Sequence, residues 1–118
     1  MKVWFTADTH FGDEKIIDFC GRPFRDADGM NAALIRKWNE FVRPEDMVWH
    51  LGDFGFGDKS QIRAWAGTLN GDIRLVRGNH DMNPNQWYRD CGFCEVYDYP
   101  VIIRNFIILS HEPIDMVK

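Results

Sequence analysis

The sequence predicts an α/β fold in which helices flank a mixed β-sheet, with the element order βαβαβα followed by antiparallel strands. Two observations predict this class. Short apolar runs rich in β-branched and aromatic residues alternate with stretches in which apolar residues recur at helical spacing. The last third of the chain then changes character, because β-forming residues dominate it.

The first half of the chain contains two helices between two strands. A buried first strand is expected over Lys2–Ala7, and a short helix capped by Asp13 over Glu14–Cys20. Apolar residues at helical spacing predict one amphipathic helix from about Gly29 to Val42, with polar residues such as Asn31 on its outer side. These elements form the first unit of the predicted sheet.

The middle of the chain repeats this pattern. A second strand is expected over Met47–Leu51, followed by a helix that Asp58 or Ser60 opens. A third strand is expected over Ile73–Val76, and a short helix with proline near its start over Pro84–Asp90. Parallel pairing of these strands follows, because helices connect them.

Two β-rich segments close the chain. Glu95–Ile103 and Phe106–Leu109 are separated by Arg104 and Asn105, which predicts a β-hairpin with a short turn. Asn70-Gly71 is also a turn signal, but the run before it has helical spacing, so it is expected to end a helix.

Composition limits the classes of function. A chain of 118 residues suits a single domain, here residues 1–118, and the formal net charge of −4 makes stable nucleic-acid binding unexpected. No apolar run approaches the ~20 residues that a membrane helix needs. Cys20, Cys91 and Cys94 are expected to be reduced thiols in a cytoplasmic protein. A redox pair or half a zinc site are alternatives for the C-x-x-C segment, but a structural role is favoured.

Side chains that can bind metal follow four of the predicted strands. They are Asp8 and His10, Asp53, Asn79 and His80, and His111. Parallel strands place equivalent ends at one edge of a sheet, so we expect these groups to converge. Oxygen and imidazole ligands without thiolate suit Mn, Fe, Zn or similar ions, and two such ions can clamp a phosphoryl group.

Simpler roles exist for each residue alone. Asp8 and Asp53 could cap helices, His10 and His80 could be surface histidines, and Asn79 could occupy a left-handed turn position. The cluster as a whole favours metal binding.

Two further polar residues lie close to these motifs. His50 lies inside a strand and is expected to have a structural role. Arg22 lies in a loop, where it is either solvated or reaches a substrate phosphate.

Asp8-x-His10, Gly52-Asp53, Gly78-Asn79-His80-Asp81 and a later His111, in this order, resemble the signature of calcineurin-like metallophosphoesterases. The likeness extends from residue 8 to residue 111. It implies the layered fold of that family and a centre of two divalent ions, of Mn, Fe, Zn, Ni or Mg. By this resemblance Asp8 and His10 would bind the first ion, Asp53 would bridge, and Asn79 and His111 would bind the second.

The same resemblance implies hydrolysis of a phosphomonoester or phosphodiester, either a small molecule or a nucleotide, by a metal-bound hydroxide. His80 would hydrogen-bond the phosphate and protonate the leaving group, Asp81 would orient His80, and Asn79 would lie at the substrate.

One element of the family pattern is absent. The family carries a downstream Gly-His-x-His that completes both metal sites, and the four histidines of this chain are already assigned. We therefore expect a C-terminally incomplete domain that lacks its last strands and exposes a sheet edge, which would promote self-association. Completion by another chain is an alternative. A non-catalytic scaffold, or a metal-binding fragment of low activity, is the alternative function.

Overall fold

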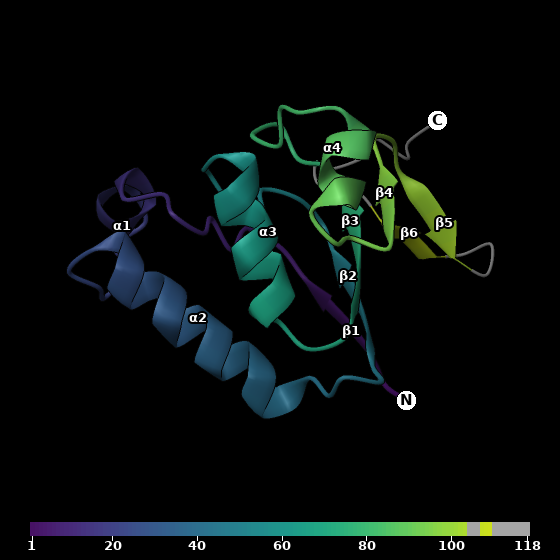
Figure 1. Ribbon diagram of the computed structural model, residues 1–118, viewed down its shortest axis with the longest axis horizontal. Helices are drawn as coiled ribbons and strands as arrows, with labels where there is room; N and C mark the ends of the chain where they lie inside the picture. Colours follow the sequence, from purple (N-terminus) through teal and green to yellow (C-terminus); the bar gives the residue numbers. More distant parts are fainter. Residues whose placement is uncertain (104–106, 110–118) are drawn as a thin grey trace, which may run out of the picture.

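A computed structural model describes residues 1–103 and 107–109 of the chain, and its centre is a four-stranded parallel sheet with the strand order β1-β2-β3-β4 (Figure 1). The strands are β1 (Val3–Thr6), β2 (Met47–His50), β3 (Asp72–Val76) and β4 (Glu95–Tyr97). The predicted α/β class and the parallel pairing of the first three strands are confirmed.

The strands end at nearly the same level. Thr6 of β1 pairs with His50 of β2, and His50 pairs with Leu75 of β3. The loops that follow these strands therefore leave the sheet together at its carboxyl edge, where open parallel sheets bind their ligands.

Four helices accompany the sheet: α1 (Lys15–Phe19), α2 (Ala27–Phe41), α3 (Lys59–Thr68) and α4 (Asn85–Asp90). In Figure 1, α2 and α3 run along one side of the sheet and α4 lies beside β4. The main core forms between these helices and the strands, and its buried members include Val48, Ile62, Leu75, Tyr88 and Val96.

The N-termini of α2 and α3 are capped by aspartates. Asp26 accepts a hydrogen bond from the Gly29 amide at 2.8 Å, so α2 begins two residues before the expected Gly29. Asp58 caps α3 in a capping box with Gln61, which decides between the two expected starts. Each cap satisfies an amide that the helix itself leaves unpaired.

Asn31 is buried, against the expectation that it would lie on the outer side of its helix. Its side-chain oxygen accepts a hydrogen bond from the Gly12 amide at 2.9 Å. The N-terminal part of α2 therefore packs against the loop that follows β1, and a polar side chain supplies a partner for the partly buried Gly12 amide.

The prediction of a buried first strand was wrong. Val3 and Phe5 are exposed, whereas Trp4 packs against the main core. Successive side chains of a strand point to opposite faces, and β1 is an edge strand whose second face carries no covering helix in the described part of the chain.

The expectation that the whole β-rich segment Glu95–Ile103 forms one arm of a hairpin was wrong, because the segment contains two strands. β4 pairs parallel with β3, whereas β5 (Val101–Ile103) pairs antiparallel with β6 (Ile107–Leu109). The division falls at Pro100, which has no N–H to donate to a continuous ladder. The expected antiparallel pairing is confirmed for β5 and β6, which form a separate two-stranded sheet (Figure 1), and the expected turn at Arg104 and Asn105 lies outside the described residues.

The C-x-x-C segment follows α4. Cys91 and Cys94 are both free thiols, and Cys91 is buried in the main core while Cys94 is exposed. Burial raises the pKa of the Cys91 thiol, which favours its unreactive protonated form.

Candidate metal centre

The loops after β1 and β2 run side by side. The Asp8 amide donates to the Gly52 carbonyl at 2.9 Å, and the Phe11 amide donates to the Phe54 carbonyl at 2.9 Å. These bonds continue the parallel arrangement beyond the strand ends. As a result, polar side chains from residues about 45 positions apart in sequence lie next to each other.

Three residues in these loops have left-handed backbone conformations. Asp8, His10 and Asp53 have φ values of 55°, 54° and 55°, and they are the positive-φ residues other than glycine in the described part of the chain. Non-glycine residues avoid this region because Cβ approaches the backbone, and such strain is concentrated at functional sites. All three are residues that the sequence predicts as metal ligands.

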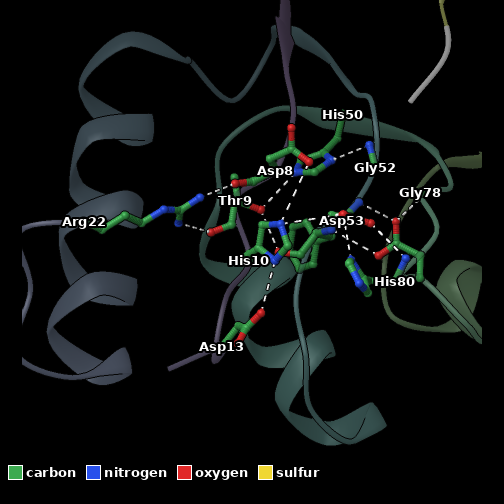
Figure 2. A network of polar contacts seen from close by, with 12 residues as sticks. Asp8, Thr9, His10, Asp13, Arg22, His50, Gly52, Asp53, Gly78 and His80 are labelled. Carbon is green, nitrogen blue, oxygen red and sulfur yellow. Dashed lines mark hydrogen bonds and ion pairs between the residues drawn. The ribbon is translucent and has the colours of Figure 1, made fainter. Parts of the chain in front are cut away.

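The same three side chains form a cluster that can hold a metal ion (Figure 2). One ligand atom from each of Asp8, His10 and Asp53 lies within 4.8 Å of the others. His10 Nε2 is 3.9 Å from Asp8 Oδ1 and 3.6 Å from Asp53 Oδ2. Two carboxylates and one imidazole, with no thiolate, fit a divalent ion of the Mn, Fe or Zn type.

Asp13 fixes the orientation of the His10 ring. Its Oδ2 atom lies 3.2 Å from His10 Nδ1, so Nε2 is the ring nitrogen that faces the cluster. The other carboxylate oxygen accepts from the Lys15 amide at 3.1 Å, close to the capping role that the sequence predicts. A carboxylate behind a ligating histidine sets its tautomer and raises its basicity.

His80 lies at the exposed edge of the cluster, against Asp53. Its amide donates to Asp53 Oδ1 at 3.0 Å, and its Nδ1 lies 3.0 Å from Asp53 Oδ2. The hydrogen bond and the negative charge of Asp53 raise the pKa of His80, which favours the imidazolium form. With Nδ1 on Asp53, Nε2 is the nitrogen left to serve a substrate.

Asp81 has a different place from the expected one beside the His80 ring. Its buried carboxylate accepts hydrogen bonds from the amides of Asp53 at 2.7 Å, Phe54 at 3.1 Å and Gly78 at 2.8 Å. The loop after β3 forms a turn, in which the Asp81 amide donates to the Gly78 carbonyl at 3.1 Å. The Asp81 carboxylate therefore lies against the backbone of the loop after β2. Asp81 therefore holds the backbone of Asp53, and the carboxylate beside the His80 ring is that of Asp53.

Arg22 contacts the backbone of the first loop. Its guanidinium donates to the Asp8 carbonyl at 2.6 Å and to the Thr9 carbonyl at 2.8 Å (Figure 2). A third contact reaches the Met30 sulfur at 3.4 Å. The structure thus places Arg22 as a support for the loop that carries two ligands, whereas the sequence left open a solvated position and a substrate contact.

A family model for calcineurin-like phosphoesterases matches residues 1–115. The chain belongs to the calcineurin-like phosphoesterase family. The Asp/His/Asp cluster therefore lies at the sheet edge of a calcineurin-like domain, and the resemblance drawn from the sequence motifs is confirmed.

Several known proteins resemble this calcineurin-like chain. An uncharacterised protein of Methanocaldococcus jannaschii is 42% identical over 82 residues, which make up 68% of the chain and 47% of that protein. The Gene 66 protein of Mycobacterium phage D29 is 41% identical over 91 residues, or 75% of the chain and 44% of that protein. The matched segments thus span less than half the length of these relatives.

A solved structure gives a likeness in three dimensions. The crystal structure of a protein of unknown function from Aquifex aeolicus matches the whole chain with a TM-score of 0.75 and 32% identity, and the chain covers 65% of it. None of the helices in residues 1–103 is long and apolar enough to cross a membrane.

His50 is a buried residue that supports both ligand-bearing loops of the calcineurin-like site. It is fully buried, accepts a hydrogen bond from the Gly52 amide at Nδ1 over 3.1 Å, and contacts Thr9 Oγ1 through Nε2 at 2.9 Å. Since Nδ1 accepts, the neutral ring carries its proton on Nε2 and donates to Thr9, whose hydroxyl donates to the Phe54 carbonyl at 2.6 Å. This relay joins both ligand-bearing loops.

The second set of predicted ligands is only partly described. Asn79 is exposed in the loop between Gly78 and His80, and His111 lies outside the described residues. The assignment of these two residues to a second ion stays a prediction.

Sequence reasoning missed the supporting functions of Thr9, Asp13 and Asn31. For Asp13 a signal was present, because it follows His10 by three residues and could reach its ring. Thr9 and Asn31 gave no such signal, since their partners Phe54 and Gly12 are 45 and 19 positions away.

Proposed function

We propose that this chain carries the catalytic core of a metal-dependent phosphoesterase that hydrolyses a phosphomonoester or phosphodiester in the cytoplasm. The observation that supports this proposal is the cluster of Asp8, His10 and Asp53, whose ligand atoms lie within 4.8 Å of one another at the sheet edge. Family membership supports the same reaction class.

Each residue has a defined part in the proposed reaction. Asp8, His10 and Asp53 hold the divalent ion, and Asn79 and His111 complete the site for a second one. When bound, such ions supply Lewis acidity toward the phosphoryl oxygens and a source of hydroxide at neutral pH.

His80 is the proposed general acid. Asp53 stabilises its imidazolium form, and Nδ1 is engaged by that carboxylate. The proton on Nε2 is therefore the one that His80 donates to the leaving oxygen of the ester. Asp81 contributes by fixing the amide of Asp53, and it touches no reacting atom.

The first prediction concerns metal-dependent hydrolysis. The chain with Mn²⁺ or Ni²⁺ should release p-nitrophenol from p-nitrophenyl phosphate or bis-p-nitrophenyl phosphate, and a chelator should abolish release. Asp53→Asn should lower kcat/KM by about 100-fold or more, as loss of a group that stabilises transition-state charge does. Asparagine tolerates the left-handed backbone at this position, so the variant should fold.

Asp90→Asn is the matched control, because Asp90 is an exposed aspartate that pairs with Lys59 away from the cluster. It should retain the rate of the unsubstituted chain. Hydrolysis of neither ester by the metal-loaded chain, or an unchanged rate in Asp53→Asn, would refute the proposed function.

A further inference from the structure

A cavity of about 880 Å³ opens beside the metal cluster. His10, Asp53 and His80 line one part of it, and residues of α1, the start of α2, and α3 line the rest. A phosphoryl group at the cluster would therefore have the remainder of its molecule in this cavity.

Two exposed phenylalanines belong to the cavity lining. Phe19 is 88% exposed and Phe56 is 70% exposed. By contrast, Phe11 and Phe54, which lie in the loops after β1 and β2, are fully buried in the core. Exposed aromatic side chains gathered at one hollow indicate a binding surface more than isolated ones do. The backbone of Phe56 is fixed at this place, because its amide donates to the Phe11 carbonyl at 2.7 Å.

Trp65 provides a rigid part of the same wall. A Cβ at Gly12, which has a φ of +76°, would lie 2.4 Å from the Trp65 ring, so the indole rests directly on the backbone there. The Trp65 ring also stacks on the Phe11 ring, with the ring centroids 6.1 Å apart and the ring planes inclined by 23°. Glycine at position 12 is therefore required for the aromatic wall to lie this close to the cluster.

The charged side chains of the lining limit what else can bind. Apart from the metal cluster and His80, Asp13, Glu14 and Asp28 are acidic, and Lys15 is the basic side chain among the described lining residues. Further phosphate groups would be repelled by this balance, so the cavity suits an uncharged organic group attached to a single phosphate.

We propose that this cavity is the subsite for the organic group of the ester, and that it selects a flat unsaturated ring packed against Phe56 and Trp65, with Phe19 at its rim. The inference rests on the proposed function, since the cluster must hold the phosphate. A flat ring presents a face to the aromatic wall, whereas a puckered saturated ring cannot stack on it.

Phenylphosphonate and cyclohexylphosphonate test this selectivity. They carry the same single phosphonate on rings of similar size, and their P–C bond is not hydrolysed, so binding is measured without turnover. Titration calorimetry on the Mn²⁺-loaded chain should show phenylphosphonate binding roughly 3–10-fold more tightly, the size of an aromatic stacking preference. Equal affinities, or no binding of either, would overturn the proposal.

Two substitutions locate the preference. Phe56→Leu keeps an apolar side chain but removes the ring, so it should bring the two affinities together while methylphosphonate binds as before. Phe41→Leu is the matched control, because Phe41 is 56% exposed on α2 and lies outside this cavity. A preference that survives Phe56→Leu, or that Phe41→Leu removes equally, contradicts the assignment.

Two further ligands show which kind of ring the cavity prefers, and the combined results distinguish failure of the subsite from failure of the proposed function. A nucleoside 5′-phosphonate and naphthylphosphonate distinguish a nucleobase from a simple aryl group, and tighter binding of either one supports the subsite. A ring preference without any metal-dependent hydrolysis would leave the subsite and refute the phosphoesterase, whereas hydrolysis without ring preference would refute the subsite alone.

Discussion

His50 connects the two loops that carry the ligands, although it belongs to neither. Its ring accepts a hydrogen bond from the Gly52 amide and donates one to the Thr9 hydroxyl. One buried side chain therefore fixes the residue before Asp53 and the residue between Asp8 and His10. Supporting groups of this kind commonly change metal affinity by about 10–100-fold when removed.

Two substitutions separate the halves of this relay. The amide oxygen of His50→Asn lies where Nδ1 was and can accept from Gly52, whereas the amide nitrogen of His50→Gln lies where Nε2 was and can donate to Thr9. Each variant should weaken Mn²⁺ binding by about 10-fold. Titration calorimetry measures this effect at a temperature where circular dichroism shows both variants folded. If both variants bind Mn²⁺ as tightly as the unsubstituted chain, His50 has no positioning role.

At the scale of elements, Asp46 ties the start of β1 to the turn before β2. Its carboxylate is buried and accepts from the amides of Arg43 at 3.0 Å and Lys2 at 2.8 Å and from the Trp4 indole at 3.0 Å. These donors lower the pKa of Asp46 to about 2.

The lowered pKa makes the junction acid-sensitive. Because the folded pKa lies below the unfolded value of about 3.9, the stabilisation is complete above that value and is lost as the pH falls toward 2. Thermal unfolding between pH 5 and pH 2 should show a decline in Tm that Asp46→Asn flattens, with a lower Tm for the variant at pH 5. The same pH slope in both proteins would count against this account.

The positions of the elements could be predicted from local patterns, but several partners could not. Apolar runs predict β1, β2 and β3, and helical spacing predicts α2 and α3. The parallel pairing of β4 with β3 could not be predicted, because the composition of the last β-rich segment does not show which strand it pairs with. Tertiary pairing decides such cases over local preference.

The same distinction holds in the candidate site. Asp8, His10 and Asp53 could be predicted as one cluster because each follows a parallel strand. The position of Asp81 could not, since its carboxylate binds amides 27 and 28 residues earlier in the chain. Motif spacing indicates which residues converge, but it does not give the direction of each side chain.

At the scale of the whole molecule, the cluster joins loops from two separate strand–helix units. A bound ion should therefore stabilise the complete fold, because it binds the native arrangement and not the unfolded chain. Ligand at about 100 times its Kd adds about 2.7 kcal/mol to the free energy of unfolding.

Thermal unfolding with increasing Mn²⁺ should show a Tm that rises by several degrees and returns with chelator. Asp8→Asn should respond less, because it loses one charged ligand while keeping a residue that tolerates the left-handed backbone. An equal rise in the Asp8→Asn variant would show that the ion acts elsewhere on the protein.

The three left-handed residues also bear on the stability of the loops that carry them. The left-handed region costs an L-residue roughly 1–2 kcal/mol, and less for aspartate, whose short polar side chain can hydrogen-bond locally. Asp8, His10 and Asp53 place two carboxylates and an imidazole in this strained region, as is common at functional sites, and the cost falls on the stability of the scaffold itself.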